Sequence, residues 1–142
     1  MSNLSMFLKK NKKQRENIFY GASADFTDEN GKAALWELRA VTTAENDRIR
    51  DDCMKEIKDK KSATVRYKLD QSLYMARLAC ASVVFPNLND AALQDSYGVK
   101  TPEALLKEML DDAGEYSSLL AKVSELSGFD REPADEVEEA KN

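Results

Sequence analysis

The stretch 73–85, LYMARLACASVVF, decides the fold. Nearly every side chain in it is apolar or small, and only Arg77 and Ser82 interrupt the run. A helix that is apolar nearly all round is a buried helix, so this stretch predicts a central core helix. Asp70 is a suitable N-cap for it, and Pro86 ends it because the residue before a proline avoids the helical conformation.

Three further helices are predicted downstream of the core helix. Asn89 or Asp90 caps a short one that stops at Gly98. The next begins at 101–103, TPE, which combines a capping hydroxyl, a proline at the first helical position and an acid in the first turn. We expect Gly114 to break that helix. The apolar face of the last helix comprises Tyr116, Leu119, Leu120, Val123 and Leu126.

Upstream of the core helix, the sequence predicts one more helix, which begins at Thr42. Glu45 stands three residues after Thr42, so the two side chains can form a capping box. Apolar residues then recur every four positions, at Ile49, Cys53 and Ile57, which predicts one buried stripe. Lysines at 58, 60 and 61 suit the C-terminus of this helix, and residues 59–68 are expected to form a loop.

The folded region opens with a predicted β-hairpin. Strand-like residues run from Ile18 to Phe26, and 28–31, DENG, supplies a turn because Asn-Gly is a strong hairpin signal. The return strand is 34–41, ALWELRAV. Its alternation places Trp36 and Leu38 on one face, where we expect the indole to anchor the hairpin on the helices.

The predicted fold class is therefore α+β and predominantly α-helical, with an N-terminal β-hairpin followed by about five helices around the central apolar helix. Residues 17–129 are expected to form a single globular domain. Residues 1–16 carry a net charge of +4 and are expected to be a flexible basic arm. Residues 130–142 carry a net charge of −4 and are expected to be a flexible acidic tail.

The composition excludes several classes of function. The chain of 142 residues has a net charge of −5, which argues against sequence-independent binding of nucleic acid. No apolar run approaches the roughly 18 residues that a membrane span needs, and the lysines of the arm follow Met6, Phe7 and Leu8, in the opposite order to a secretory signal. We therefore expect a cytosolic protein without a membrane or nucleic-acid partner.

Catalysis is not predicted from the side chains available. The chain has no histidine, which removes the commonest general base and metal ligand. Cys53 and Cys80 lack a CxxC or metal-ligand pattern and are interpreted as buried thiols. The carboxylate pairs at 51–52 and 111–112 are interpreted as parts of solvated helix faces, since neighbouring helical residues point about 100° apart.

A calcium loop around residues 25–31 is also not predicted. Asp25, Asp28 and Asn30 lie near a glycine, but an EF-hand loop requires a glutamate at its twelfth position, and that position is Trp36. The sequence thus predicts no enzyme, no cofactor and no metal site, and a function must come from binding other proteins.

Several longer stretches are similar to one known family. The stretch 85–99, FPNLNDAALQDSYGV, resembles a signature of the XkdN-like phage tail assembly chaperones. The resemblance continues with 102–110, PEALLKEML, and includes the earlier stretch 36–42, WELRAVT. It covers residues 18 to 130 in matching order and spacing.

This resemblance implies a non-enzymatic chaperone in the cytoplasm of a bacterial host that carries a phage or prophage. Such chaperones bind the long, helical and aggregation-prone tape measure protein, assist assembly of the tail tube around it and are absent from the mature virion. The partners implied are the tape measure protein and the tail tube protein, and a homo-oligomer is left open. The alternative is a minor structural tail or head-completion protein that is retained in the virion; a carboxylate-based enzyme is a third reading.

One apolar stripe is a candidate for the partner-binding site. It consists of Leu105, Leu106, Met109 and Leu110. Methionine adapts to varied partners, which favours a binding role. The alternative is that this stripe packs against the core helix, and burial within the monomer would exclude the binding role.

Overall fold

The computed structural model describes residues 3–130 and has a mixed α+β fold, as predicted. The acidic tail after Asp130 lies outside the described residues. The helices of the described part are α1 (Thr43–Asp52), α2 (Gln71–Ser82), α3 (Ala91–Ser96), α4 (Pro102–Met109) and α5 (Ala113–Leu126). Its strands are β1 (Ile18–Tyr20), β2 (Trp36–Leu38), β3 (Met54–Lys58), β4 (Val65–Leu69) and β5 (Val83–Phe85), and the basic arm contains two 3-10 turns, η1 (Asn3–Phe7) and η2 (Lys9–Asn11).

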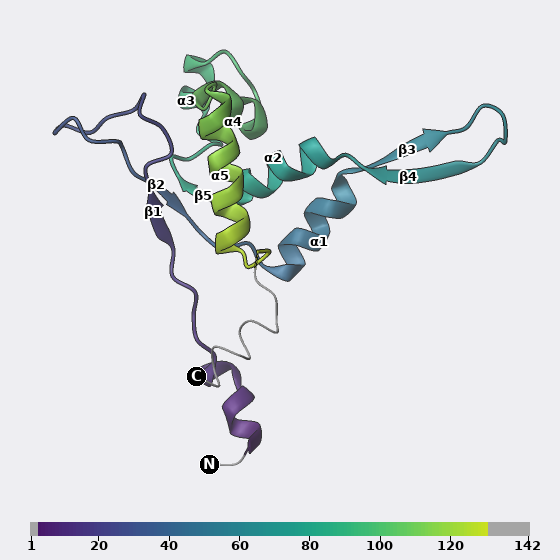
Figure 1. The fold of residues 1–142 in the computed structure, drawn as a ribbon, viewed down its shortest axis with the longest axis horizontal. Helices are drawn as coiled ribbons and strands as arrows, with labels where there is room; N and C mark the ends of the chain where they lie inside the picture. The colour runs from purple at the N-terminus through teal and green to yellow at the C-terminus, as the bar shows by residue number, and fades with distance from the viewer. Residues whose placement is uncertain (1–2, 131–142) are drawn as a thin grey trace.

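A three-stranded antiparallel sheet has β2 at its centre, with β1 and β5 on either side (Figure 1). In the β1–β2 pair, Ile18 lies opposite Leu38. Each of these two strands has three residues and is shorter than the run from which we expected it. Residues 21–35 form a long connection between them, and Gly31 takes a left-handed φ of 78° at the expected turn.

The core lies between the inner face of this sheet and helices α2, α4 and α5. Trp36 and Leu38 are buried in it, as their alternation predicted. From α2 it receives Tyr74, Leu78 and Ala79. The prediction that the 73–85 stretch supplies the central helix is confirmed for the part up to Ser82, because α2 packs against α1, α4 and α5.

The end of the core helix was predicted wrongly. Helix α2 stops at Ser82, and residues 83–85 form β5, which adds to the free edge of β2. Two hydrogen bonds fix this change of structure: the Arg39 amide donates to the Ser82 carbonyl over 2.8 Å, and the Ser82 hydroxyl donates to the Arg39 carbonyl over 2.6 Å. Valine and phenylalanine favour strands when a strand edge is available for pairing. Pairing with the edge of β2 therefore outweighs the helical pattern of residues 83–85.

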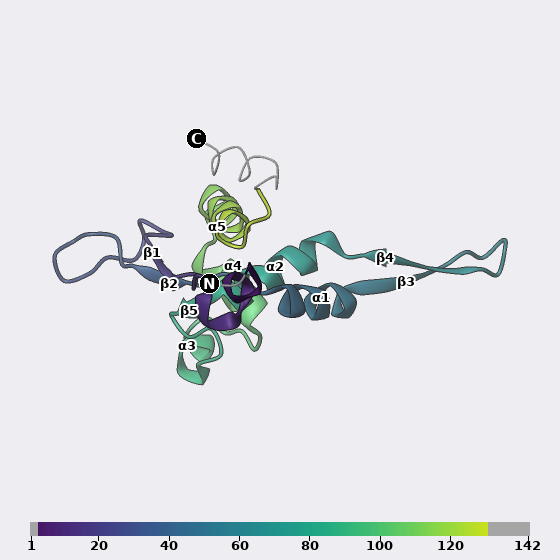
Figure 2. The same cartoon turned by 90° about the horizontal axis from the view of Figure 1, so that it is seen from below.

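A second hairpin replaces the predicted end of the first helix and the predicted loop. Helix α1 ends at Asp52, and β3 and β4 then pair over five residues, with Glu56 opposite Tyr67 and Lys58 opposite Val65. The four-residue repeat of 49, 53 and 57 was therefore misread as one helical stripe, because Ile57 lies on β3. Both views show this hairpin extending away from the helices (Figures 1 and 2).

Most helix starts agree with the predicted caps. Thr42 and Glu45 form the full capping box of α1, and the side chains of Asp70 and Thr101 cap α2 and α4. Asp90, rather than Asn89, caps α3. These caps are local in sequence, which explains why residue patterns predict them.

Gly114 does not break a helix, contrary to the prediction. Helix α4 ends earlier, at Met109, and Asp112 caps α5 by accepting a hydrogen bond from the Glu115 amide over 3.0 Å. Gly114 belongs to the first turn of α5, where an added Cβ would lie 3.3 Å from a carboxylate oxygen of Asp112. Its lack of a side chain thus leaves room for the cap.

Within residues 3–130, no helix is both long enough and apolar enough to span a membrane.

Candidate protein-binding surfaces

The predicted partner stripe on α4 is part of the core. Leu105 and Leu106 have no exposed surface, and Met109 and Leu110 are 6% and 2% exposed. Helix α4 packs on α2 through its apolar side, and its polar residues Lys107 and Glu108 are exposed to solvent. Burial leaves no surface there for a partner in the monomer, so a binding surface has to be sought elsewhere.

The carboxylates considered as catalytic candidates have structural or solvated positions. Asp51 and Asp52 are exposed on α1, and Asp112 caps α5. Asp28 accepts hydrogen bonds from the backbone amides of Asn30 and Lys32, so its carboxylate holds the turn. Among residues 3–130, no cluster of three or more cysteine, aspartate or glutamate side chains could hold a metal ion.

The pKa of Glu45 is strongly lowered by hydrogen bonds from Arg39 and Thr42. Its carboxylate accepts two hydrogen bonds from the guanidinium of Arg39, one of them over 2.8 Å, and a third from the Thr42 amide over 3.1 Å. The Arg39 hydrogen bonds, followed by those of Thr42, lower the Glu45 pKa to about 2. A carboxylate held ionised at the start of a helix stabilises that helix, and it offers no proton for catalysis.

The two thiols are unsuited to nucleophilic chemistry. Cys53 is buried at the end of α1, and burial raises its pKa. Burial also raises the pKa of the Cys80 thiol to about 12. Since the thiolate is the reactive form of cysteine, both side chains act as apolar packing groups at neutral pH.

The outer face of the three-stranded sheet carries exposed apolar side chains on both sides of the half-buried Glu37. Phe19 on β1 and Phe85 on β5 lie opposite Glu37 on either side, and they are 67% and 62% exposed. Leu35, directly before β2, and Val84, at the irregularity in the β2–β5 pair, are exposed as well. We call Phe19, Leu35, Val84 and Phe85 the outer sheet face.

The contrast between the two sides of the sheet marks this face as unusual. Trp36, Leu38 and Val83 of the same sheet are buried and belong to the core. Single exposed apolar residues are common, but a group of them that includes two phenylalanines is typical of a binding surface. The sequence pattern did not reveal this face, although the alternation in β2 implies a second face on each neighbouring strand.

The β3–β4 hairpin is a second exposed element. On one of its faces lie Met54, Val65 and Tyr67, which are 41%, 48% and 67% exposed. Two strands without a covering layer are marginally stable by themselves, so this hairpin depends on its attachment to the body.

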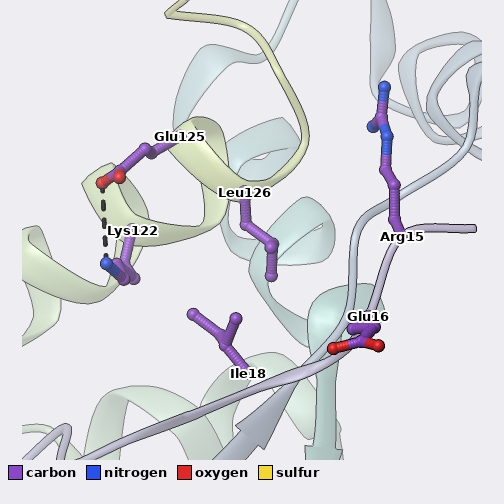
Figure 3. A pocket seen from close by; sticks show the side chains of 6 residues that line it. All are labelled: Arg15, Glu16, Ile18, Lys122, Glu125 and Leu126. Atoms are coloured by element: carbon purple, nitrogen blue, oxygen red, sulfur yellow. Dashed lines mark ion pairs between the residues drawn. The ribbon is translucent and has the colours of Figure 1, made fainter. Parts of the chain in front are cut away.

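A hollow with a volume of about 510 Å³ lies beside the base of the arm. Ile18 of β1 and Leu126 of α5 face each other across it (Figure 3). Its rim carries the ion pair of Lys122 with Glu125, at 3.7 Å, together with Arg15 and Glu16 from the arm. The described residues that line the hollow do not direct a cluster of polar groups at one point, so it suits an apolar side chain of a protein partner rather than a small substrate.

Comparison with known proteins gives a consistent result over the whole chain. A family described as "Phage XkdN-like tail assembly chaperone protein, TAC" matches residues 4–141. The "Phage-like element PBSX protein XkdN" of Bacillus subtilis (strain 168) is 32% identical over 142 residues, which cover 98% of this chain and 93% of that protein.

A second relative has a solved structure. The "Uncharacterized protein YqbN" of Bacillus subtilis (strain 168) is 30% identical over 139 residues, covering 98% of this chain and 93% of that protein. The crystal structure of the protein YqbN superimposes with a TM-score of 0.75 at 25% identity, covering 92% of this chain and 99% of that one.

Proposed function

Because the chain belongs to the XkdN-like family of phage tail assembly chaperones, we propose that it binds the tape measure protein of a phage tail and assists assembly of the tail tube around it. The proposal places this activity in the cytoplasm of the bacterial host. It also includes release of the chaperone before the virion is complete.

The observation that carries the proposal is the outer sheet face. A long helical protein with an apolar stripe aggregates unless that stripe is covered. A helix packs naturally on an apolar sheet face, as it does in layered α+β folds. The sheet already has helices on its inner side, and a tape measure helix on Phe19 and Phe85 would supply the missing layer.

The size of this face fits reversible binding. Burying a phenylalanine side chain contributes about 1.5–3 kcal/mol, and every 1.4 kcal/mol changes an affinity about tenfold. The two phenylalanines therefore support specific binding, while the few apolar residues around them keep the surface small. A modest surface suits a chaperone that tail tube subunits have to displace.

The test is co-expression with the tape measure protein of the same phage genome. The wild-type chain should raise the soluble fraction of the tape measure protein and co-purify with it. The Phe19→Ser/Phe85→Ser variant should bind at least about tenfold more weakly, because both apolar contacts are lost. Titration of a purified tape measure fragment, followed by calorimetry, measures the difference.

Tyr67→Ser is the matched control, since Tyr67 is also 67% exposed but lies on the β3–β4 hairpin. It should bind like the wild type. A variant at Phe19 and Phe85 with unchanged affinity would contradict the use of the outer sheet face, and a loss at Tyr67 would move the surface to the hairpin.

Mass spectrometry of purified virions distinguishes the proposal from its alternative. We expect tail tube and tape measure peptides without peptides of this chain. Stoichiometric recovery of this chain from virions would support a structural tail or head-completion protein instead.

A further inference from the structure

The β3–β4 hairpin carries a charge opposite to that of the chain as a whole. Residues 54–69 contain six basic and two acidic side chains, whereas the whole chain has a net charge of −5. All six basic residues of the hairpin are exposed. Since the hairpin extends away from the helices (Figure 2), a partner can approach it beyond them.

The strand register divides the charges of the hairpin between its two faces. Residues directly opposite each other in an antiparallel pair lie on the same face, and neighbours along a strand alternate between faces. Lys55 lies opposite Lys68, and Ile57 lies opposite Arg66, so these four residues share one face. Glu56 lies on the other face. We call Lys55, Arg66 and Lys68, together with Ile57, the cationic face.

The stability of the hairpin does not explain this arrangement. Like charges directly opposite each other destabilise a strand pair, and Lys55 and Lys68 form such a pair. Asp59, directly after β3, holds the turn, because its carboxylate accepts a hydrogen bond from the Lys61 amide over 2.9 Å. A partner that brings carboxylates to the cationic face would offset the repulsion, so binding would stabilise the hairpin.

The positions of the apolar side chains distinguish between anionic partners. Single-stranded nucleic acid binds where aromatic rings and cations line one groove, but Tyr67 lies on the face opposite to the cationic face. A membrane surface requires apolar side chains that insert beside the cations, and Met54 and Val65 also lie on that opposite face. The net charge of −5 disfavours duplex DNA. Ile57 is half-buried and lies next to cations on the cationic face, and an apolar centre with a polar rim is typical of a protein interface.

We propose that the cationic face binds an acidic helix of a partner protein. A helix is the element that covers a sheet face in α+β folds. Carboxylates three or four positions apart on a helix are separated by about 5–6 Å. Arg66 and Lys68 are two positions apart on a strand and therefore about 6.5–7 Å apart, while opposite residues such as Lys55 and Lys68 are about 5 Å apart. These spacings match within the reach of flexible side chains. The site is separate from the outer sheet face, so it does not depend on binding of the tape measure protein.

The test is NMR titration of the full-length chain with a synthetic helical peptide. The peptide has about 20 residues, enough for a helix, and is rich in alanine, with glutamates three and four positions apart. The control peptide has glutamine at the same positions. In low salt, the glutamate peptide should shift the backbone amide signals of 55–58 and 65–68, and the glutamine peptide should leave them unchanged. The amide signal of Leu105 reports that the core remains folded.

Matched variants locate the site within the hairpin. The test variant carries Lys55→Gln, Arg66→Gln and Lys68→Gln, and it should bind the glutamate peptide at least about tenfold more weakly, because three exposed ion pairs are lost. The control variant removes the same charge from the opposite face and the connecting turn, by Lys58→Gln, Lys60→Gln and Lys61→Gln. It should bind less than about threefold more weakly, since only screened, distant charges are lost.

A charge-conserving variant keeps the test valid if the neutral variant fails to form the hairpin. Lys55→Arg/Lys68→Arg retains both charges and should bind the glutamate peptide like the wild type. The amide signals of 54–69 in each free variant show whether the hairpin is formed.

Four results would overturn the proposal. The first is unmoved signals of 55–58 and 65–68 in the wild type at millimolar peptide. The second is equal weakening in the two glutamine variants, which would show attraction to the charge of the hairpin without a defined site. The third is tighter binding of a duplex DNA oligonucleotide or of phosphatidylserine vesicles at the same salt, which would assign the face to nucleic acid or to a membrane. The fourth is a shift of these signals on raising the protein concentration alone, which would assign the face to a second copy of the chain.

Discussion

The side chain of Leu106 is completely inaccessible to solvent, although it lies on a helix whose next two residues, Lys107 and Glu108, are exposed. It belongs to a buried cluster to which α2 and α5 also contribute residues. The amphipathic pattern of α4 therefore has a structural role: its apolar side stabilises the monomer, and its polar side is exposed to solvent.

Leu106→Ala should lower the free energy of unfolding by about 2–5 kcal/mol, since it removes buried methyl groups and leaves a cavity. Leu35→Ala, at a position that is 58% exposed, should change it by less than about 0.5 kcal/mol. Urea denaturation followed by circular dichroism measures both. A small effect at Leu106 would contradict its place in the core.

Glu45 makes stability depend on pH. Its pKa is lowered from 4.5 to about 2 in the folded chain, so its contribution is present above about pH 4.5 and is lost as the pH falls towards 2. Glu45→Gln keeps a capping side chain but loses the charge that Arg39 pairs with. At pH 7 we expect a loss of about 1 kcal/mol.

The check is urea denaturation of the wild type and Glu45→Gln between pH 2 and pH 7. The difference in free energy of unfolding should shrink through the range from 4.5 to 2. A difference that stays constant over this range would show that the ionised carboxylate is not its source.

At the scale of elements, the two sheets contribute differently to the fold. The three-stranded sheet carries Trp36, Leu38 and Val83 into the core. The β3–β4 hairpin has no fully buried residue, and its bases are joined to the body at Cys53 and Asp70, where the Asp70 amide donates to the Cys53 carbonyl over 2.9 Å. The hairpin is thus attached to the core without forming it.

Replacing residues 55–68 by Asn-Gly should leave the body folded. Met54 and Leu69 are opposite each other in the hairpin, so a two-residue turn can join them. We expect the free energy of unfolding to change by less than about 1 kcal/mol, because few apolar contacts are lost. Thermal denaturation and the amide spectrum of residues 71–126 provide the measurement, and loss of cooperative unfolding would contradict the prediction.

Helix α5 shows how completely local signals can define an element. Asp112 caps its start. At its end, Gly128 takes a left-handed φ of 87°, the Gly128 amide donates to the Glu125 carbonyl, and the Phe129 amide donates to the Ser124 carbonyl. This pair of hydrogen bonds is a Schellman motif, which satisfies carbonyls that the helix leaves free.

For the molecule as a whole, the described part combines one apolar core with surfaces of different character. Helix α2 joins these parts, since it contacts α1, α4 and α5 and leads directly into the sheet. Cys53 and Cys80 lie at or beside this core. Their reactivity therefore reports on unfolding of the entire domain rather than on a local site.

At pH 8, iodoacetamide should label both thiols at least about a hundredfold more slowly in the folded chain than in urea, because burial suppresses the thiolate. Mass spectrometry should show unlabelled and doubly labelled chains, with little singly labelled chain. Accumulation of a singly labelled species under native conditions would indicate that one thiol is exposed by local opening.

The sequence predicted the mixed fold class, the core position of 73–82 and most helix starts. It did not predict the end of α2, the β3–β4 hairpin or the outer sheet face. Ser82 and Arg39 illustrate the reason, because the hydrogen bonds that end α2 join residues 43 positions apart. Such a partner is visible only once the chain has folded.

The same distinction applies to the two apolar surfaces considered for binding. The sequence by itself determined that α4 has an apolar stripe and that β1 and β5 carry aromatic residues, since side-chain type and periodicity are local properties. Only the tertiary structure decided that Leu105 and Leu106 are covered while Phe19 and Phe85 are not. Burial depends on which elements pack together, and the free energy of that packing is shared among residues far apart in the chain.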